Sequence, residues 1–102
     1  MAGEDFLTNL EHVIRDRMET APEGSYTAQL VAKGISKIAQ KVGEEGVELA
    51  LAGCVEPDDR VVAETADLIY HTIVLLNARG IPLSAVFAEL EARHRARSKP
   101  SP

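Results

Sequence analysis

Apolar residues recur along this chain at spacings of three and four, which is the periodicity of amphipathic α-helices. Ser25 is expected to cap the start of a short second helix, because its hydroxyl can accept a backbone N–H. Gly53 and Gly80 are expected to end the third and fourth helices. The predicted helices cover residues 5–20, 25–33, 35–52, 58–79 and 82–94.

The fourth predicted helix is apolar around nearly its whole circumference. Such a helix must be surrounded by others, and a chain of about 100 residues can hardly bury it alone. We therefore expect an all-α fold, a bundle of four to five helices that is completed by homodimerisation. Residues 1–94 are predicted to form one domain, and the basic segment 95–102 to be a flexible tail.

Composition and charge argue against several classes of protein. The chain has 102 residues and a net charge of -5, which disfavours a nucleic-acid partner. Cys54 is the single cysteine, so an intramolecular disulfide framework is excluded. No apolar run approaches the roughly 20 residues of a membrane span, and the acidic start of the chain is unlike a signal peptide. We expect a cytoplasmic protein that does not bind membranes.

Two groups of acidic residues interrupt the third and fourth predicted helices. Glu45 and Glu48 form one i, i+3 pair, and Glu64 and Asp67 form another, each beside a predicted buried face. The short connection between these helices favours antiparallel packing, which lets the pairs face each other. Four facing carboxylates need a compensating cation, and a hard divalent ion such as Mg²⁺ fits best. A carboxylate site for Mg²⁺ suggests phosphate chemistry.

The alternative is that these acids form a solvated helix face on which Glu45 pairs with Lys41 at i, i+4 spacing. The near absence of other charges between Val61 and Ala78 favours the metal site. The three scattered histidines and one cysteine do not have the spacing of a zinc site. The GEEG segment lacks the spacing of a phosphate-binding loop.

Two segments, GSYTAQLVAKGISKIAQKVGEEGVELALA and ETADLIYHTIVLLNARGIPLSAVFAELEARH, carry EExxE and then ExxD on successive helices. In this the chain resembles the all-α nucleoside triphosphate pyrophosphohydrolases, the MazG-like superfamily. With GSYT and the Asp-Leu-x-Tyr-His run, it is most similar to the phosphoribosyl-ATP pyrophosphatase family, from about Phe6 to His94. Gly46 departs from the family pattern, which has a better helix former there.

The resemblance implies Mg²⁺-dependent hydrolysis of phosphoribosyl-ATP to phosphoribosyl-AMP and pyrophosphate, the second step of histidine biosynthesis. It implies a homodimer, and it leaves a separate cyclohydrolase as a candidate partner. The implied metal ligands are Glu45, Glu48, Glu64 and Asp67.

Other roles follow from the same resemblance. Glu44 is expected either to act as a base that orients water or to support the ligands, and it is a candidate catalytic residue with Glu45 and Glu48. His71 is expected to lie near the metal site or to donate to Asp67 one turn earlier, and a structural role is the plainer alternative. The candidate substrate-binding residues are Lys37, Lys41, Lys33, Ser25, Tyr26 and Thr27. Helix capping by Ser25 and surface solubility for the lysines are the plainer alternatives.

Two other functions stay open at this point. One is a MazG-like pyrophosphatase that acts on ribo- or deoxyribonucleoside triphosphates, although the GSYT segment favours phosphoribosyl-ATP. The other is a non-catalytic helical module that dimerises and whose acids are only solvated.

Overall fold

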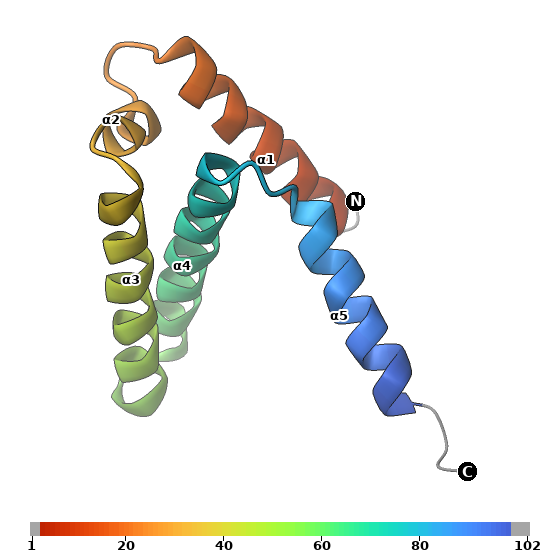
Figure 1. The fold of residues 1–102 in the computed structure, drawn as a ribbon. Coiled ribbons are helices and arrows are strands. Elements are labelled where there is room, and N and C mark those ends of the chain that lie inside the picture. Colours follow the sequence, from red (N-terminus) through yellow and green to blue (C-terminus); the bar gives the residue numbers. More distant parts are fainter. Residues whose placement is uncertain (1–2, 99–102) are drawn as a thin grey trace.

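The computed structural model describes residues 3–98, which form five helices joined by short connections (Figure 1). The predicted all-α class is confirmed. The helices are α1 (Gly3–Thr20), α2 (Tyr26–Ala32), α3 (Ile35–Val55), α4 (Asp58–Ala78) and α5 (Leu83–Ser98).

The centre of the fold is the antiparallel pair of α3 and α4 (Figure 1), which have the most extensive contact of any two helices. The short α2 packs against both of them, and α1 crosses α4 and α2. All five helices supply side chains to one small core, so that a single apolar centre joins them. The buried members of this core are Ile14, Leu30, Ile38, Ile73, Val74 and Leu83.

Local backbone chemistry explains where most helices begin and end. Ser25 caps α2 as predicted, with its Oγ accepting the N–H of Ala28 at 3.2 Å. Gly80 has a φ of 71° after α4, and the N–H groups of Gly80 and Ile81 bond back to Asn77 and Leu76. These two hydrogen bonds form a Schellman motif, whose residue after the helix has a left-handed conformation. Glycine adopts that conformation without strain.

Two predicted helix ends are wrong. α3 passes through Gly53 and ends at Val55, because Pro57 forces Glu56 into an extended conformation with φ -110° and ψ 162°. α5 does not end near His94 but continues to Ser98, so residues 95–98 are helical rather than part of a tail. Ion pairs Glu89–Arg93 and Glu91–Arg95 support this last stretch, at 2.8 Å and 3.5 Å. The predicted tail residues 99–102 lie outside the described residues.

A buried carboxylate, Glu11 of α1, fixes the start of α5. Its Oε2 accepts the backbone N–H of Leu83 at 2.6 Å, and Arg15 lies 3.7 Å from the same oxygen. The backbone oxygen of Glu11 accepts an N–H from the side chain of Asn77 at 3.3 Å. The first N–H groups of a helix have no partner within it, so an acceptor from another helix stabilises this end. Glu11 thus joins α1 to both α4 and α5.

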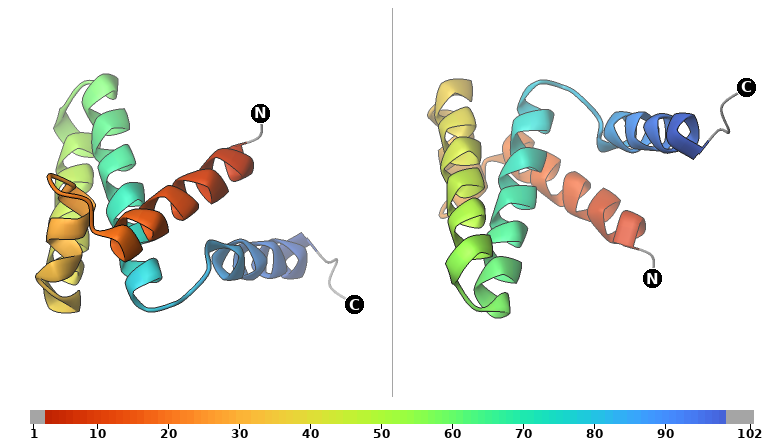
Figure 2. Two further views of the ribbon diagram at one scale, coloured as in Figure 1. Left: turned by 90° about the horizontal axis from the view of Figure 1, so that it is seen from above. Right: turned by 90° about the horizontal axis from the view of Figure 1, so that it is seen from below.

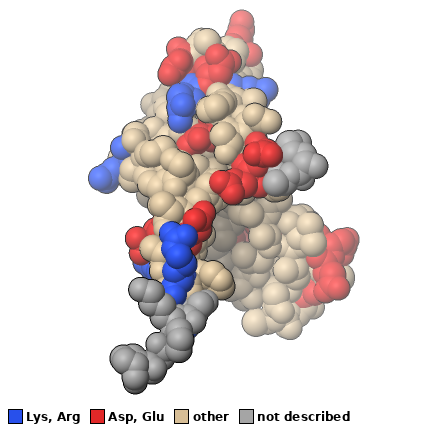
Figure 3. Space-filling view, turned by 90° about the vertical axis from the view of Figure 1, so that its right-hand side faces the viewer, with Lys and Arg blue, Asp and Glu red and all other residues tan. Residues whose placement is uncertain are grey.

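The chain is open rather than closely folded. Its radius of gyration is 15.9 Å, against about 13 Å for a compact domain of this length. α1 and α5 diverge from the α3–α4 pair on the same side (Figure 2). On the side toward which α5 projects, charged groups are separated by broad uncharged surface (Figure 3). Many large apolar side chains are therefore exposed on this single chain.

By length and composition alone, α4 is apolar enough to cross a membrane, and no other helix in residues 3–98 is. The core helix of a soluble bundle passes the same test, and α4 holds the buried Glu64 and His71. Ionisable side chains of this kind are costly on a lipid-facing helix. The composition of α4 is therefore consistent with its central place between α3 and α1.

We expect Glu11→Ala to lower the free energy of unfolding by roughly 1–3 kcal/mol, the usual effect of removing a charged acceptor from a buried N–H. Urea denaturation followed by circular dichroism measures this change. Glu19→Ala, an exposed change on the same helix, is the matched control and should stay within about 0.5 kcal/mol of the original chain. Equal effects of the two substitutions would show that Glu11 does not hold α5.

Candidate metal centre

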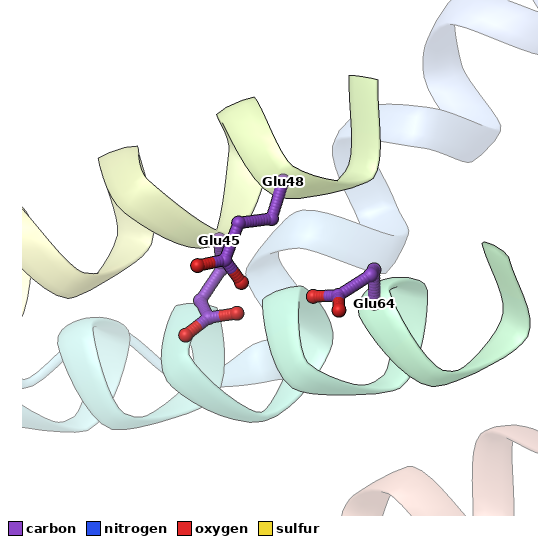
Figure 4. Close-up of side chains that lie close together, drawn as sticks. All are labelled: Glu45, Glu48 and Glu64. Atoms are coloured by element: carbon purple, nitrogen blue, oxygen red, sulfur yellow. The ribbon is translucent and has the colours of Figure 1, made fainter. Parts of the chain in front are cut away.

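Three carboxylates converge between α3 and α4 (Figure 4). Glu45 and Glu48 come from α3, and Glu64 comes from α4. One oxygen of each lies within 4.8 Å of the corresponding oxygens of the other two. The i, i+3 spacing on α3 and the antiparallel packing place these side chains together, as the sequence predicts for these three residues.

Two of these carboxylates are buried. Glu45 is 5% exposed and Glu64 is 7% exposed, whereas Glu48 lies at the exposed edge of the group. The Oε2 atoms of Glu45 and Glu64 are buried and have no hydrogen-bond partner among residues 3–98. A buried anionic oxygen without a partner is costly, so the group is short of positive charge.

Lys41 and Arg60 supply part of that charge. Lys41 Nζ lies 3.3 Å from Glu45 Oε1 and 3.8 Å from an oxygen of Glu44. Its hydrogen bond to Glu45 raises the pKa of the Lys41 ammonium, which therefore stays protonated at neutral pH. On α4, Arg60 Nη2 lies 2.5 Å from Glu64 Oε1. The predicted alternative of a Lys41–Glu45 pair is thus present together with the converged carboxylates.

Sequence reasoning did not identify Arg60. A signal for it exists, because Arg60 precedes Glu64 by four residues, as Lys41 precedes Glu45. The repeated spacing places one cation and one carboxylate on the same face of each helix.

Asp67 and Glu44 lie outside the converged group. Asp67 is exposed, one turn beyond Glu64 on α4, and its side chain is not among the oxygens within 4.8 Å. Glu44 is also exposed, and its Oε2 accepts the side-chain N–H of Gln40 at 3.0 Å. The structure therefore brings together three of the four predicted metal ligands.

Two hydroxyl contacts join α2 to α4 beside this group. His71 is buried, and its Nδ1 lies 2.7 Å from the backbone oxygen of Asp67. That oxygen only accepts, so the ring proton lies on Nδ1, and Nε2 accepts the hydroxyl of Tyr26 at 2.7 Å. The hydroxyls of Thr27 and Tyr70 are also hydrogen-bonded to each other. His71 therefore donates to the backbone oxygen of Asp67 rather than to its carboxylate. The hydroxyl of the buried Thr27 is hydrogen-bonded to that of Tyr70.

The remaining predicted substrate residues lie on the surface of α2 and α3. Lys37 Nζ is 3.5 Å from Oε1 of Gln40, and Lys33 is exposed just after α2. Ser25 is engaged in capping. An open hollow of about 710 Å³ lies on the outward face of α3, next to the carboxylates. Its lining residues are Gln40, Gly43, Glu44, Val47 and Glu48.

The donor set fits a hard divalent cation. All three converged side chains offer carboxylate oxygens, which Mg²⁺ and Mn²⁺ prefer, and neither sulfur nor imidazole nitrogen belongs to the group. The Oε2 atoms of Glu45 and Glu64 are buried without a hydrogen-bond partner in the described part of the chain, and such a cation would give them a partner. Glu45, Glu48 and Glu64 would hold it, with Glu48 at the side that opens to the hollow.

Comparison with known proteins gives the family. The profile of the phosphoribosyl-ATP pyrophosphohydrolase family matches residues 7–94. The chain belongs to this family. The resemblance read from EExxE, ExxD and GSYT is thereby confirmed.

Individual relatives agree with this assignment. A phosphoribosyl-ATP pyrophosphatase from Ignicoccus hospitalis is 51% identical over 94 residues, which are 92% of this chain and 92% of the relative. One from Pyrobaculum islandicum is 50% identical, over 89% of this chain and 97% of the relative. A histidine biosynthesis bifunctional protein HisIE from Xanthomonas axonopodis pv. citri is 54% identical over 92% of this chain and 46% of its own length. The chain thus spans about half the length of the bifunctional relatives it matches.

The Tyr26–His71 contact predicts a change of stability with pH. Burial raises the pKa of the Tyr26 hydroxyl above its ordinary value of 10.0, so the folded chain favours the neutral form. This contribution to stability is complete below about pH 10 and is lost as the pH rises through the raised pKa.

We expect Tyr26→Phe to cost about 1 kcal/mol near neutral pH, because Nε2 of the buried His71 loses its partner. The difference from the original chain should shrink above about pH 10, as Tyr26 ionises. Urea denaturation at several pH values measures both effects. Parallel pH profiles for the two proteins would contradict this assignment.

Proposed function

We propose that this chain hydrolyses phosphoribosyl-ATP to phosphoribosyl-AMP and pyrophosphate in a Mg²⁺-dependent reaction. The observation that carries the proposal is the convergence of Glu45, Glu48 and Glu64 between α3 and α4, with buried oxygens left unpaired. Membership of the phosphoribosyl-ATP pyrophosphohydrolase family supports this substrate. The names of the relatives from Ignicoccus and Pyrobaculum support the same activity.

The proposed metal ligands are Glu45, Glu48 and Glu64, with Asp67 as a fourth from the next turn of α4. When bound, Mg²⁺ neutralises charge on the phosphates of the substrate. The carboxylates of α3 and of α4 would together hold the ion. Glu48 is the ligand nearest the substrate, because it also lines the open hollow on α3.

The chain's own residues position the phosphates and the attacking water. Lys41 and Lys37 lie one turn apart on α3, before the acids, and bind phosphate oxygens as point charges. Glu44 lines the hollow beside Glu48 and accepts a proton from water. The water oxygen forms a bond to one phosphorus of the α–β phosphoanhydride while the bond from that phosphorus to the bridging oxygen breaks. One product carries the water oxygen, and the other keeps the bridging oxygen.

Tyr26 of α2 has a half-exposed side chain, and its hydroxyl is hydrogen-bonded to Nε2 of His71. In the proposal, Tyr26 faces the ribose or base of the substrate while Ser25 caps its helix. Lys33, exposed just after α2, is the third proposed phosphate contact. A separate cyclohydrolase as a partner stays a prediction, which the bifunctional HisIE relatives make worth testing.

The proposed catalytic unit is a homodimer. Val47, Leu51 and Val55 form an exposed apolar line on α3, and Leu51 and Val55 are 59% and 83% exposed. Val62 and Ile69 are exposed apolar residues of α4. A second copy that covers this surface would bury it and would close the hollow beside Glu48. The open shape of the single chain supports this arrangement.

Leu51→Asp is expected to convert the dimer into monomers, because it places an unpaired carboxylate in the proposed interface. Analytical ultracentrifugation measures the mass, and circular dichroism shows that the helices are retained. Val13→Asp, at an exposed apolar residue of α1, is the control and should leave the dimer intact. A dimer that withstands Leu51→Asp, or one that both substitutions disrupt, would argue against this interface.

Glu64→Gln is expected to reduce pyrophosphate release from phosphoribosyl-ATP by at least about a hundredfold, because it removes charge from a buried position between the helices. The assay measures pyrophosphate with and without Mg²⁺. Glu89→Gln, on the exposed surface of α5, is the matched control and should retain activity. Full activity of Glu64→Gln, or of the original chain without divalent cation, would reject the proposed site.

The same assay separates the rival substrate class. Turnover of deoxyribonucleoside triphosphates equal to or better than that of phosphoribosyl-ATP would support a MazG-like pyrophosphatase instead. The absence of any hydrolysis would leave the non-catalytic helical module.

A further inference from the structure

The two buried carboxylates share one asymmetry. In each, Oε1 is paired with a cation and Oε2 has no partner within residues 3–98. Glu45 Oε1 faces Lys41 Nζ at 3.3 Å, and Glu64 Oε1 faces Arg60 Nη2 at 2.5 Å. Each side chain therefore keeps one buried oxygen free for a further positive charge, in residues that converge with Glu48 between α3 and α4.

The two cations reach the cluster from opposite ends. Each comes from four residues earlier on its own helix, and α3 and α4 run antiparallel (Figure 1). Lys41 lies in the half of α3 that follows α2, and Arg60 lies in the first turn of α4, next to the α3–α4 connection. Lys41 is one of the lysines proposed to bind the substrate phosphates, and Lys37 and Lys33 precede it in the chain. Arg60 has no role in the proposed function.

Arg60 has a second partner outside the cluster. Its Nε lies 3.6 Å from Oε1 of Glu56, so the guanidinium bridges Glu56 and Glu64. The Arg60 side chain is 51% exposed, and that of Glu56 is 40% exposed, whereas Glu64 is buried. Arg60 can therefore leave Glu64 without losing all of its charge pairing, because Glu56 remains within reach.

A divalent cation and the guanidinium would repel each other at one carboxylate. The two positive charges would lie on neighbouring oxygens of Glu64, in a partly buried place where water screens charge poorly. Before a metal binds, the same guanidinium reduces the repulsion between Glu64 and the carboxylates of α3. Arg60 thus stabilises the carboxylate cluster without metal and opposes the binding of a divalent cation to it.

We propose that Arg60 is the resident counterion of the carboxylate cluster, which competes with the divalent cation for Glu64 and moves to Glu56 when that cation binds. This inference rests on the proposed metal site, and it adds a residue that sets the affinity of the site. It predicts opposite effects of one substitution, a less stable chain without metal and a tighter site for metal.

The experiment measures Mg²⁺ and Mn²⁺ binding in the absence of nucleotide, by calorimetry and by Mn²⁺ paramagnetic resonance. For Arg60→Gln, we expect affinity to rise roughly three- to tenfold, the effect of removing one nearby charge. We also expect a lower melting temperature without metal and a larger increase on adding Mg²⁺. Arg60→Lys retains the charge and should bind metal more weakly than Arg60→Gln does.

Arg93→Gln is the matched control, because Arg93 and Glu89 form an i, i+4 pair at 2.8 Å on the exposed surface of α5. It should leave metal affinity unchanged. Glu56→Gln tests the second partner of Arg60, and it should weaken metal binding in the original chain but not in the Arg60→Gln background. This double-mutant cycle separates an effect through Arg60 from a general loss of negative charge.

Equal or weaker metal affinity of Arg60→Gln would overturn the inference, because Arg60 would then hold Glu64 in place rather than compete for it. Glu64→Gln distinguishes this result from failure of the site itself. If the original chain binds metal and Glu64→Gln does not, the site stands and the Arg60 variants alone decide. If the original chain binds no divalent cation, both proposals fail.

Discussion

Glu45 and Glu64 are like-charged groups buried between two antiparallel helices, and each keeps one oxygen without a hydrogen-bond partner in the described part of the chain. Burial and mutual repulsion both oppose this arrangement. Lys41 and Arg60 offset part of the charge from the helix edges, but they reach only one oxygen of each carboxylate. The carboxylate cluster between α3 and α4 therefore carries an excess of negative charge, which a hard cation would offset.

The rest of the fold holds the α3–α4 pair in place. α2 is joined to α4 through Tyr26 with His71 and Thr27 with Tyr70, so the helix that carries these two proposed substrate residues is tied to the turn that carries Asp67. Glu11 anchors α1 to the start of α5 on the other side. Part of the exposed apolar surface lies on α3 and α4 themselves, and Val47 belongs both to it and to the lining of the hollow. Site and proposed interface thus share the same two helices.

Much of this arrangement could be predicted from local patterns. Ser25 and Gly80 act through hydrogen bonds to their own neighbours, and the sequence contains all that those bonds require. Gly53 was a weaker signal than Pro57, which constrains the residue before it. Periodicity put Glu45, Glu48, Glu64 and Asp67 at the flanks of their helices, but burial depends on how each helix is rotated in the packed structure. Asp67 is consequently exposed while Glu64 is buried. The capping of Leu83 by Glu11 joins residues 72 positions apart, and no local pattern contains it.

The central claim is that α3 and α4 build a site for a hard divalent cation from Glu45, Glu48 and Glu64. The most direct test is an anomalous difference map from crystals grown with Mn²⁺. The account predicts a peak enclosed by these three carboxylates, in contact with the Oε2 atoms of Glu45 and Glu64. Mn²⁺ bound elsewhere on the chain, with no peak between these helices, would contradict it.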